Sequence, residues 1–177
     1  MSLKAHFRRT LDAQPGRLHF AAHSHHPWPD VTFEAHQQAW LDAARHLDSK
    51  WDLVFEQLIP RVQGRVAQEL DLSSPASLVF APNTHELVLR LLSCLPARPR
   101  VVTSDAEFHS LDRQLRRLEE DDLVEVTRVA TEPFDSFQAR LSDAAAAQRA
   151  QLVFVSHVFF NSGAALRDVP ALVKALP

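Results

Sequence analysis

The second half of the chain alternates short apolar runs with segments of helical periodicity. Four runs, at residues 77–80, 100–104, 123–129 and 151–157, are each followed by a stretch with the apolar spacing of a helix. The runs are largely apolar throughout, which is typical of strands that are buried on both faces. We therefore expect an α/β fold: a mostly parallel sheet with helices on both faces.

The first 70 residues lack this alternation and have the pattern of helices joined by a loop. Residues 2–14 and 31–47 show helical spacing, and Asp30 is expected to be the N-cap of the longer helix. A third helical segment, 51–70, contains Pro60, which should kink or divide it because proline removes a backbone donor.

The change of pattern near residue 70 predicts two parts. Residues 1–70 would form an N-terminal helical segment with an entry loop, and residues 71–177 an α/β domain. A net charge of -3 gives no reason to expect nucleic acid or an anionic membrane as a partner. No run approaches the roughly 18 apolar residues of a membrane span, and the N-terminus lacks the apolar core of a signal peptide. A single cysteine fits a reducing compartment, so a cytoplasmic protein is expected.

Polar residues follow the first apolar run, where an α/β sheet places its ligand crevice. The segment "APNTHEL" begins a predicted helix, and the free amides of a helix start suit a phosphate. Thr84 adds a hydroxyl there. The alternative is that Asn83 or Thr84 is simply an N-cap without a ligand.

Two further strand ends carry candidate groups. Phe108 and His109 precede a predicted helix and could stack on a flat ligand, or they could belong to a hydrophobic staple with Ser110 as the N-cap. Ser156 and His157 end the most strand-like run of the chain. They do not form a catalytic dyad, because neighbours on a strand face opposite ways.

The stretch "HFAAHSHHPWPD", residues 19–30, contains a cluster of histidines at 23, 25 and 26. Imidazole is a good zinc ligand, and a strand followed by His-x-His begins many metallohydrolase sites. Such a site needs further ligands from later strands. The two prolines of the stretch also suit plain packing of the loop, and we expect no metal here.

Four segments together resemble kynureninase and, more broadly, the class V aminotransferase-like group of fold-type I pyridoxal-phosphate (PLP) enzymes. They are "LHFAAHSHHPWP", "FAPNTHELVLRLLSCL", "SDAEFHSLDRQLRRL" and "LVFVSHVFFNSGAALRDVPAL". They occur in the family's order and extend from about residue 18 to the C-terminus. The resemblance implies that residues 71–177 form part of a PLP-binding large domain.

The resemblance assigns roles to individual residues. Seven positions would contact the PLP cofactor: Asn83, Thr84, Phe108, His109, Ser110, Leu111 and Ser156. Asn83 and Thr84 would hold the phosphate, Phe108 would stack on the pyridoxal ring, and Ser156 would reach the cofactor from the strand end. Ser24 and His23 would lie on the substrate side of the site.

The chain also departs from the family pattern. Leu111 stands where the family has an aspartate, although Asp112 follows by one position. The entry loop has histidines where relatives have Asn, Leu and Gly, which leaves the substrate open. In the family, the aspartate that pairs with the pyridine nitrogen and the lysine that forms the Schiff base come from later strands. None of Lys4, Lys50 and Lys174 lies in a matching motif, so we expect no catalytic residue in this segment.

The resemblance therefore implies the N-terminal half of a PLP-dependent enzyme. The whole enzyme would hydrolyse a Cβ–Cγ bond of an amino acid such as kynurenine, and it would be a homodimer. Two alternatives stay open: another class V reaction, of the desulfurase or aminotransferase type, and a non-catalytic interaction module that keeps half of the fold.

Overall fold

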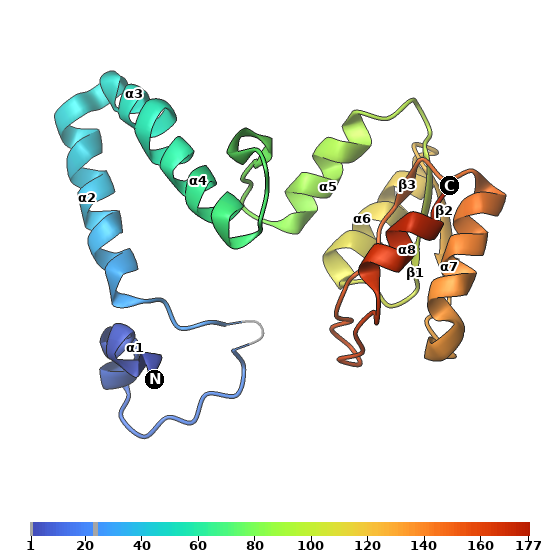
Figure 1. Cartoon of the computed structure of the whole chain (residues 1–177), viewed down its shortest axis with the longest axis horizontal. Coiled ribbons are helices and arrows are strands. Elements are labelled where there is room, and N and C mark those ends of the chain that lie inside the picture. The colour runs from blue at the N-terminus through green and yellow to red at the C-terminus, as the bar shows by residue number, and fades with distance from the viewer. Residues whose placement is uncertain (1, 23–24) are drawn as a thin grey trace. The chain divides into compact units, whose positions relative to one another are not determined.

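The computed structural model describes residues 2–22 and 25–177 of the chain. It divides into two units, which we call the N-terminal unit (residues 1–79) and the C-terminal unit (residues 80–177) (Figure 1). The boundary lies at the end of the first apolar run. No helix in the described part of the chain is both long and apolar enough to cross a membrane.

The N-terminal unit consists of helices and turns. Its elements are the 3-10 helix η1 (Leu3–His6), α1 (Arg8–Ala13), α2 (Asp30–His46), the 3-10 helix η2 (Leu47–Ser49), α3 (Lys50–Asp52), the π-helical turn η3 (Leu53–Leu58), α4 (Ile59–Glu69) and the 3-10 helix η4 (Pro75–Ser77). The helix expected at 2–14 is therefore two short pieces. The backbone stays helical through Pro60 and is not divided there: the π-helical turn ends at Leu58, and Pro60 lies in the first turn of α4, where its missing N–H is tolerated.

Asp30 does not cap its own helix as expected. Pro29 is the N-cap residue of α2, and Asp30 is its first helical residue. The Asp30 carboxylate accepts hydrogen bonds from the Arg8 amide at 2.9 Å and from the Arg9 amide at 3.0 Å. These amides belong to the first turn of α1, where free N–H groups and the helix dipole favour an anion. The carboxylate thus fastens α1 to the start of α2.

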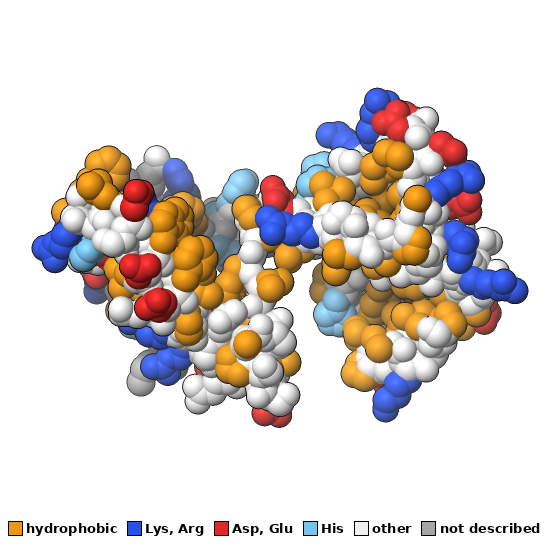
Figure 2. Space-filling view, turned by 90° about the horizontal axis from the view of Figure 1, so that it is seen from above, with side chains coloured by type: hydrophobic (Ala, Val, Ile, Leu, Met, Phe, Trp, Pro, Cys, Tyr) orange, Lys and Arg blue, Asp and Glu red, His pale blue; other side chains and the backbone are white. Residues whose placement is uncertain are grey.

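The N-terminal unit buries little of its apolar surface. Ala67 is its single buried residue among those that the structure describes. Large apolar side chains stay exposed, among them Trp40 (77% exposed), Trp28 (68%) and Phe55 (61%). Figure 2 shows such hydrophobic side chains in orange on the surface of this unit.

A parallel sheet forms the centre of the C-terminal unit, which confirms the α/β class. Its strands are β1 (Arg100–Ser104), β2 (Glu125–Val129) and β3 (Leu152–Val153), in the order β2-β1-β3. Val102 of β1 pairs in parallel with Thr127 of β2 and with Val153 of β3.

Helices cover both faces of this sheet, as the apolar runs predicted (Figure 1). They are α5 (Thr84–Ser93), α6 (His109–Glu120), α7 (Phe134–Gln148) and α8 (Val169–Ala175). Because successive strand residues face opposite ways, Val101 and Val102 enter different cores. Val101 packs with buried residues of α5 and α6, whereas Val102 packs with buried residues of α7 and α8.

Of the four expected strands, one is absent and another is shorter than expected. Residues 77–80 form no strand: Ser77 ends η4, and the Leu78 carbonyl accepts a hydrogen bond from Gln63 Nε2 at 2.7 Å. A strand needs a paired neighbour, and this run has none among the described residues. The run at 151–157 pairs as a strand only at Leu152 and Val153, after which the Phe154 amide still donates to the Val102 carbonyl at 3.0 Å.

Candidate functional site

A pocket of about 180 Å³ lies in the C-terminal unit, at the start of α5 and beyond the carboxyl ends of β1 and β3. It is lined by Thr84, His85, Val88, Phe108, Ser110, Leu111, Phe154 and Ser156. Five of the seven residues that the resemblance assigned to cofactor contact are in this set: Thr84, Phe108, Ser110, Leu111 and Ser156. They come from three segments of the chain. Parallel sheets bind their ligands at this edge.

The start of α5 supplies free backbone donors to the pocket. Asn83 is the N-cap of the helix, and its Oδ1 accepts from the Glu86 amide at 3.0 Å. The Asn83 side chain therefore caps the helix and does not line the pocket. Thr84 and His85 occupy the first turn, whose amides have no intrahelical acceptor. Together with the helix dipole these amides favour an anion.

His85 was not singled out from the sequence, although it lines the pocket. Its Nδ1 is buried and has no hydrogen-bond partner within the described chain. The same is true of Oγ1 of Thr103, which is 1% exposed and lies on the Val101 face of β1. A buried polar atom without a partner costs about 1–3 kcal/mol.

Glu107 is a second residue that sequence reasoning missed. It is 6% exposed. Oε1 accepts from Ser104 Oγ at 2.6 Å and from the Ser156 amide at 3.1 Å, and Oε2 accepts from Ser156 Oγ at 2.6 Å. The carboxylate thus ties the end of β1 to the segment after β3. An acidic residue in the strand-end motif "SDAEF" was the available signal.

Aromatic rings gather at the start of α6. Phe108 is 47% exposed, and its ring centroid lies 4.0 Å from that of His109 and 5.1 Å from that of Phe160. The helix begins at His109 with Phe108 as its N-cap residue, so the alternative with Ser110 as the N-cap is not realised. Ser110 lines the pocket, whereas His109 does not. Phe108 therefore offers the pocket a ring at its rim.

Leu111 and Asp112 have different surroundings. Leu111 is 5% exposed and belongs to the core between α5, α6 and the sheet, as well as lining the pocket. The carboxylate of Asp112 lies 2.8 Å from Arg116 Nε and 3.1 Å from Arg128 Nε. Burial acts to raise the pKa of Asp112, but the hydrogen bonds from the two arginines outweigh it and hold this pKa below its ordinary value. Asp112 is thus committed to an ion-pair network and is not a lining residue of the pocket.

The segment after β3 turns back at Gly163. Gly163 has φ +71°, a conformation that favours glycine, and its amide donates to the Phe159 carbonyl at 2.8 Å. Phe160 lies within this turn, and its ring contacts the ring of Phe108. His157 is exposed and does not line the pocket.

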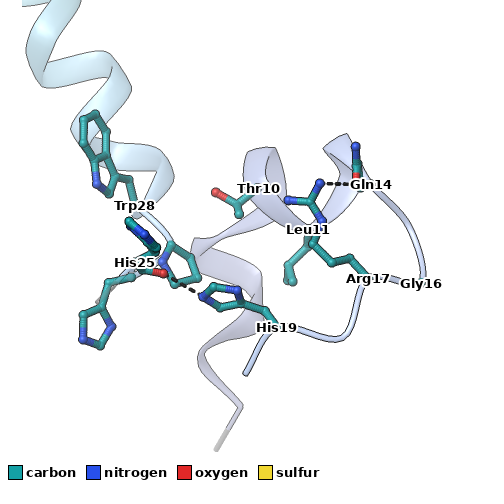
Figure 3. Close-up of a pocket in the computed structure, with 10 residues that line it drawn as sticks. Thr10, Leu11, Gln14, Gly16, Arg17, His19, His25 and Trp28 are labelled. Atoms are coloured by element: carbon teal, nitrogen blue, oxygen red, sulfur yellow. Dashed lines mark hydrogen bonds between the residues drawn. The ribbon is translucent and has the colours of Figure 1, made fainter. Parts of the chain in front are cut away.

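The histidine loop lies in the N-terminal unit, beside a pocket of about 590 Å³ (Figure 3). The pocket is lined by Thr10, Leu11, Gln14, Gly16, Arg17, His19, His25, His26, Pro27 and Trp28. His23 and Ser24, which the resemblance put on the substrate side, lie outside the described residues. Across residues 2–22 and 25–177, no group of three or more His, Cys, Asp or Glu side chains is arranged to hold a metal ion.

The two pockets thus differ in their chemistry. The pocket of the C-terminal unit combines helix-start amides, three hydroxyls, an imidazole and two aromatic rings. The pocket of the N-terminal unit combines a guanidinium and three imidazoles with apolar side chains. No family model, curated protein or solved structure matches the chain.

Proposed function

We propose that the C-terminal unit is the cofactor-binding part of a PLP-dependent enzyme that resembles kynureninase. One observation carries the proposal: Thr84, Phe108, Ser110 and Ser156, assigned separately to cofactor contact, line a single pocket. They are drawn from three segments that follow different strands or precede different helices. The pocket lies where parallel sheets bind ligands, at the carboxyl ends of the strands.

The residues present fit a phosphorylated aromatic cofactor. The amides of Thr84 and His85 and the hydroxyls of Thr84 and Ser110 would hold the phosphate at the start of α5. Phe108 would stack on the ring, and Ser156 would meet the cofactor from the side of Glu107. The unpaired Nδ1 of His85 is the kind of buried group that a polar ligand satisfies. When bound, PLP supplies an electron sink for bond cleavage at an amino acid.

The pocket does not by itself supply the whole chemistry. None of Lys4, Lys50 and Lys174 is among its lining residues. The Schiff-base lysine and the aspartate at the pyridine nitrogen would therefore come from a further part of a longer protein. We propose that this protein is a cytoplasmic homodimer that hydrolyses a Cβ–Cγ bond of an amino acid such as kynurenine.

Titration of the chain with PLP tests the cofactor assignment. We expect saturable binding that is weaker for pyridoxal, which lacks the phosphate that α5 would hold. Ser110→Ala and Phe108→Leu should each raise the dissociation constant, the first by about tenfold because a hydrogen bond to a charged group is lost. Ser93→Ala, an exposed hydroxyl at the far end of α5, and Phe55→Leu in the N-terminal unit serve as matched controls. Equal binding of PLP and pyridoxal would contradict the phosphate assignment, and absence of binding would favour the non-catalytic interaction module.

The reaction type needs a protein that contains both this chain and a Schiff-base lysine. Given kynurenine, it should release alanine and an aromatic acid. Transfer of the amino group to an oxo acid, or release of sulfur from a thiol-containing amino acid, would instead assign the alternative class V reactions.

A further inference from the structure

The pocket of the N-terminal unit has the size of a small-molecule site. Its volume of about 590 Å³ falls within the roughly 300–1,000 Å³ of typical ligand pockets. Figure 3 shows Arg17 and Leu11 across the pocket from His25 and Trp28. The lining residues come from α1, from the loop after it and from the segment that leads into α2.

The ionisable side chains that line this pocket are all basic. Its ionisable lining residues are Arg17, His19, His25 and His26, and no Asp or Glu belongs to the described lining. Arg17 donates a hydrogen bond to Gln14 Oε1, and within the described chain no carboxylate pairs with it. Most of the five N–H donors of the guanidinium therefore remain for a ligand.

The surrounding sequence does not neutralise this charge. The first 28 residues contain four Lys or Arg side chains and a single acidic one, Asp12, together with five of the ten histidines. The whole chain, by contrast, carries a net charge of -3. The carboxylate of Asp30 is not part of the described lining and accepts hydrogen bonds from the amides of Arg8 and Arg9. This segment is thus a local concentration of positive charge on an acidic chain.

Backbone contacts give the pocket a defined shape. His19 Nε2 donates to the His25 carbonyl at 2.7 Å, and the His25 amide donates to the Ala21 carbonyl at 2.8 Å. Because a carbonyl can only accept, the first contact places a proton on His19 Nε2 and fixes the ring. Trp28 meets the His36 ring edge-on at a centroid distance of 6.0 Å, which orients the indole.

We propose that this pocket binds a small organic oxyanion, a carboxylate or phosphate carried on an apolar body. The oxyanion would meet the guanidinium of Arg17, whose fork of donors matches a carboxylate or phosphate in two-point contact. The imidazoles of His25 and His26 add donors when protonated. The apolar body would lie against Leu11, Pro27 and Trp28. This inference concerns the N-terminal unit and does not rest on the cofactor proposal.

Titration of the chain with three probes, followed by backbone amide NMR at about pH 6, tests the proposal. Benzoate and phenyl phosphate carry the two oxyanions on the same ring, and benzamide is the uncharged counterpart of benzoate. We expect saturable shifts at residues 10–28 with the two anions and far smaller ones with benzamide. The anion with the lower dissociation constant shows whether the pocket prefers a carboxylate or a phosphate. Equal shifts with benzamide, or no saturable shift at these residues, would overturn the proposal.

Variants separate the Arg17 site from a general effect of positive charge. Arg17→Gln should weaken benzoate binding by about tenfold, because it removes a charge-assisted contact and keeps a polar side chain of similar reach. Arg65→Gln removes an exposed charge from α4 of the same unit and should leave the affinity unchanged. His25→Gln should give an intermediate loss. The same loss in Arg65→Gln as in Arg17→Gln would show that only net charge matters and would refute the site.

Discussion

Glu107 accepts two hydrogen bonds from Ser156, one from its amide at 3.1 Å and one from its hydroxyl at 2.6 Å, although 49 positions separate the two residues. With the bond from Ser104, the carboxylate joins the ends of two neighbouring strand segments. The Ser156 proton is committed to Glu107, so Ser156 Oγ can only accept a hydrogen bond from a ligand in the pocket. The carboxyl group of Glu107 is therefore a buried acceptor that links the segments of the site.

Removal of this acceptor should destabilise the C-terminal unit. Glu107→Ala leaves the donors of Ser104 and Ser156 unpaired, and we expect a loss of about 3 kcal/mol in the free energy of unfolding. Glu107→Gln keeps one acceptor oxygen and should lose less. Urea unfolding followed by circular dichroism measures both. Glu120→Gln, an exposed residue at the end of α6, is the control and should change stability by less than about 0.5 kcal/mol.

Asp112 should make stability depend on pH in the acid range. Its pKa is lowered in the folded chain, so the unfolded chain binds the proton more tightly. The stabilisation is therefore fully present above the ordinary carboxyl pKa of about 3.9 and is lost as the pH falls through the lower folded value. Asp112→Asn should show a shallower loss of stability below about pH 4 than the unaltered chain. Asp143→Asn, an exposed site on α7, should follow the unaltered profile, and a matching profile for Asp112→Asn would contradict the prediction.

Phe137 should be among the costliest residues to truncate. Its side chain is fully buried, and its ring centroid lies 5.6 Å from that of Phe159 and 6.1 Å from that of Phe134. Phe137→Ala should lower the free energy of unfolding by about 3–5 kcal/mol, because it removes buried apolar area and leaves a cavity. Phe137→Leu should cost less. Chemical denaturation gives both values, and similar losses for the two variants would argue against a packed aromatic cluster.

Asp30 should control the order of α1. A helix of six residues is unstable by itself, and the Asp30 carboxylate binds its first amides. Asp30→Ala should therefore raise the hydrogen exchange rates of the amides in Arg8–Ala13 while those in the middle of α2 keep their protection. Asp42→Ala is the control within α2, since the carboxylate of Asp42 accepts a hydrogen bond from Gln38 of its own helix. Unchanged exchange in α1 would show that other contacts hold it.

The sequence predicted those elements whose partners are local or numerous. The apolar runs at 100–104 and 123–129 became paired strands, and all four helices of the C-terminal unit followed their expected apolar spacing. The run at 77–80 failed because apolar character alone does not create a strand; a neighbouring edge is also required. The run is followed directly by α5, so its position still marked the start of the candidate site.

The sequence predicted where the candidate site lies, but it did not predict all of the residues that form it. Strand ends located Phe108 and Ser156, because topology places such residues at one edge of the sheet, whereas Thr84 was located by the start of α5. The sequence did not predict Glu107 and His85, because their roles depend on burial and on distant partners, which a single sequence does not show. Asp30 was assigned to the correct helix start but to the wrong partner, since the competing amides of α1 lie more than 20 positions away.

The uneven burial of aromatic residues gives the chain a built-in optical reporter. Trp28, Trp40 and Trp51 are its three tryptophans, all lie exposed in the N-terminal unit, and the chain has no tyrosine. Tryptophan fluorescence therefore reports on the N-terminal unit alone and does not report the unfolding of the α/β core. A shift of the emission to shorter wavelength with rising protein concentration would report that a second copy covers these indoles, without any label attached to the protein.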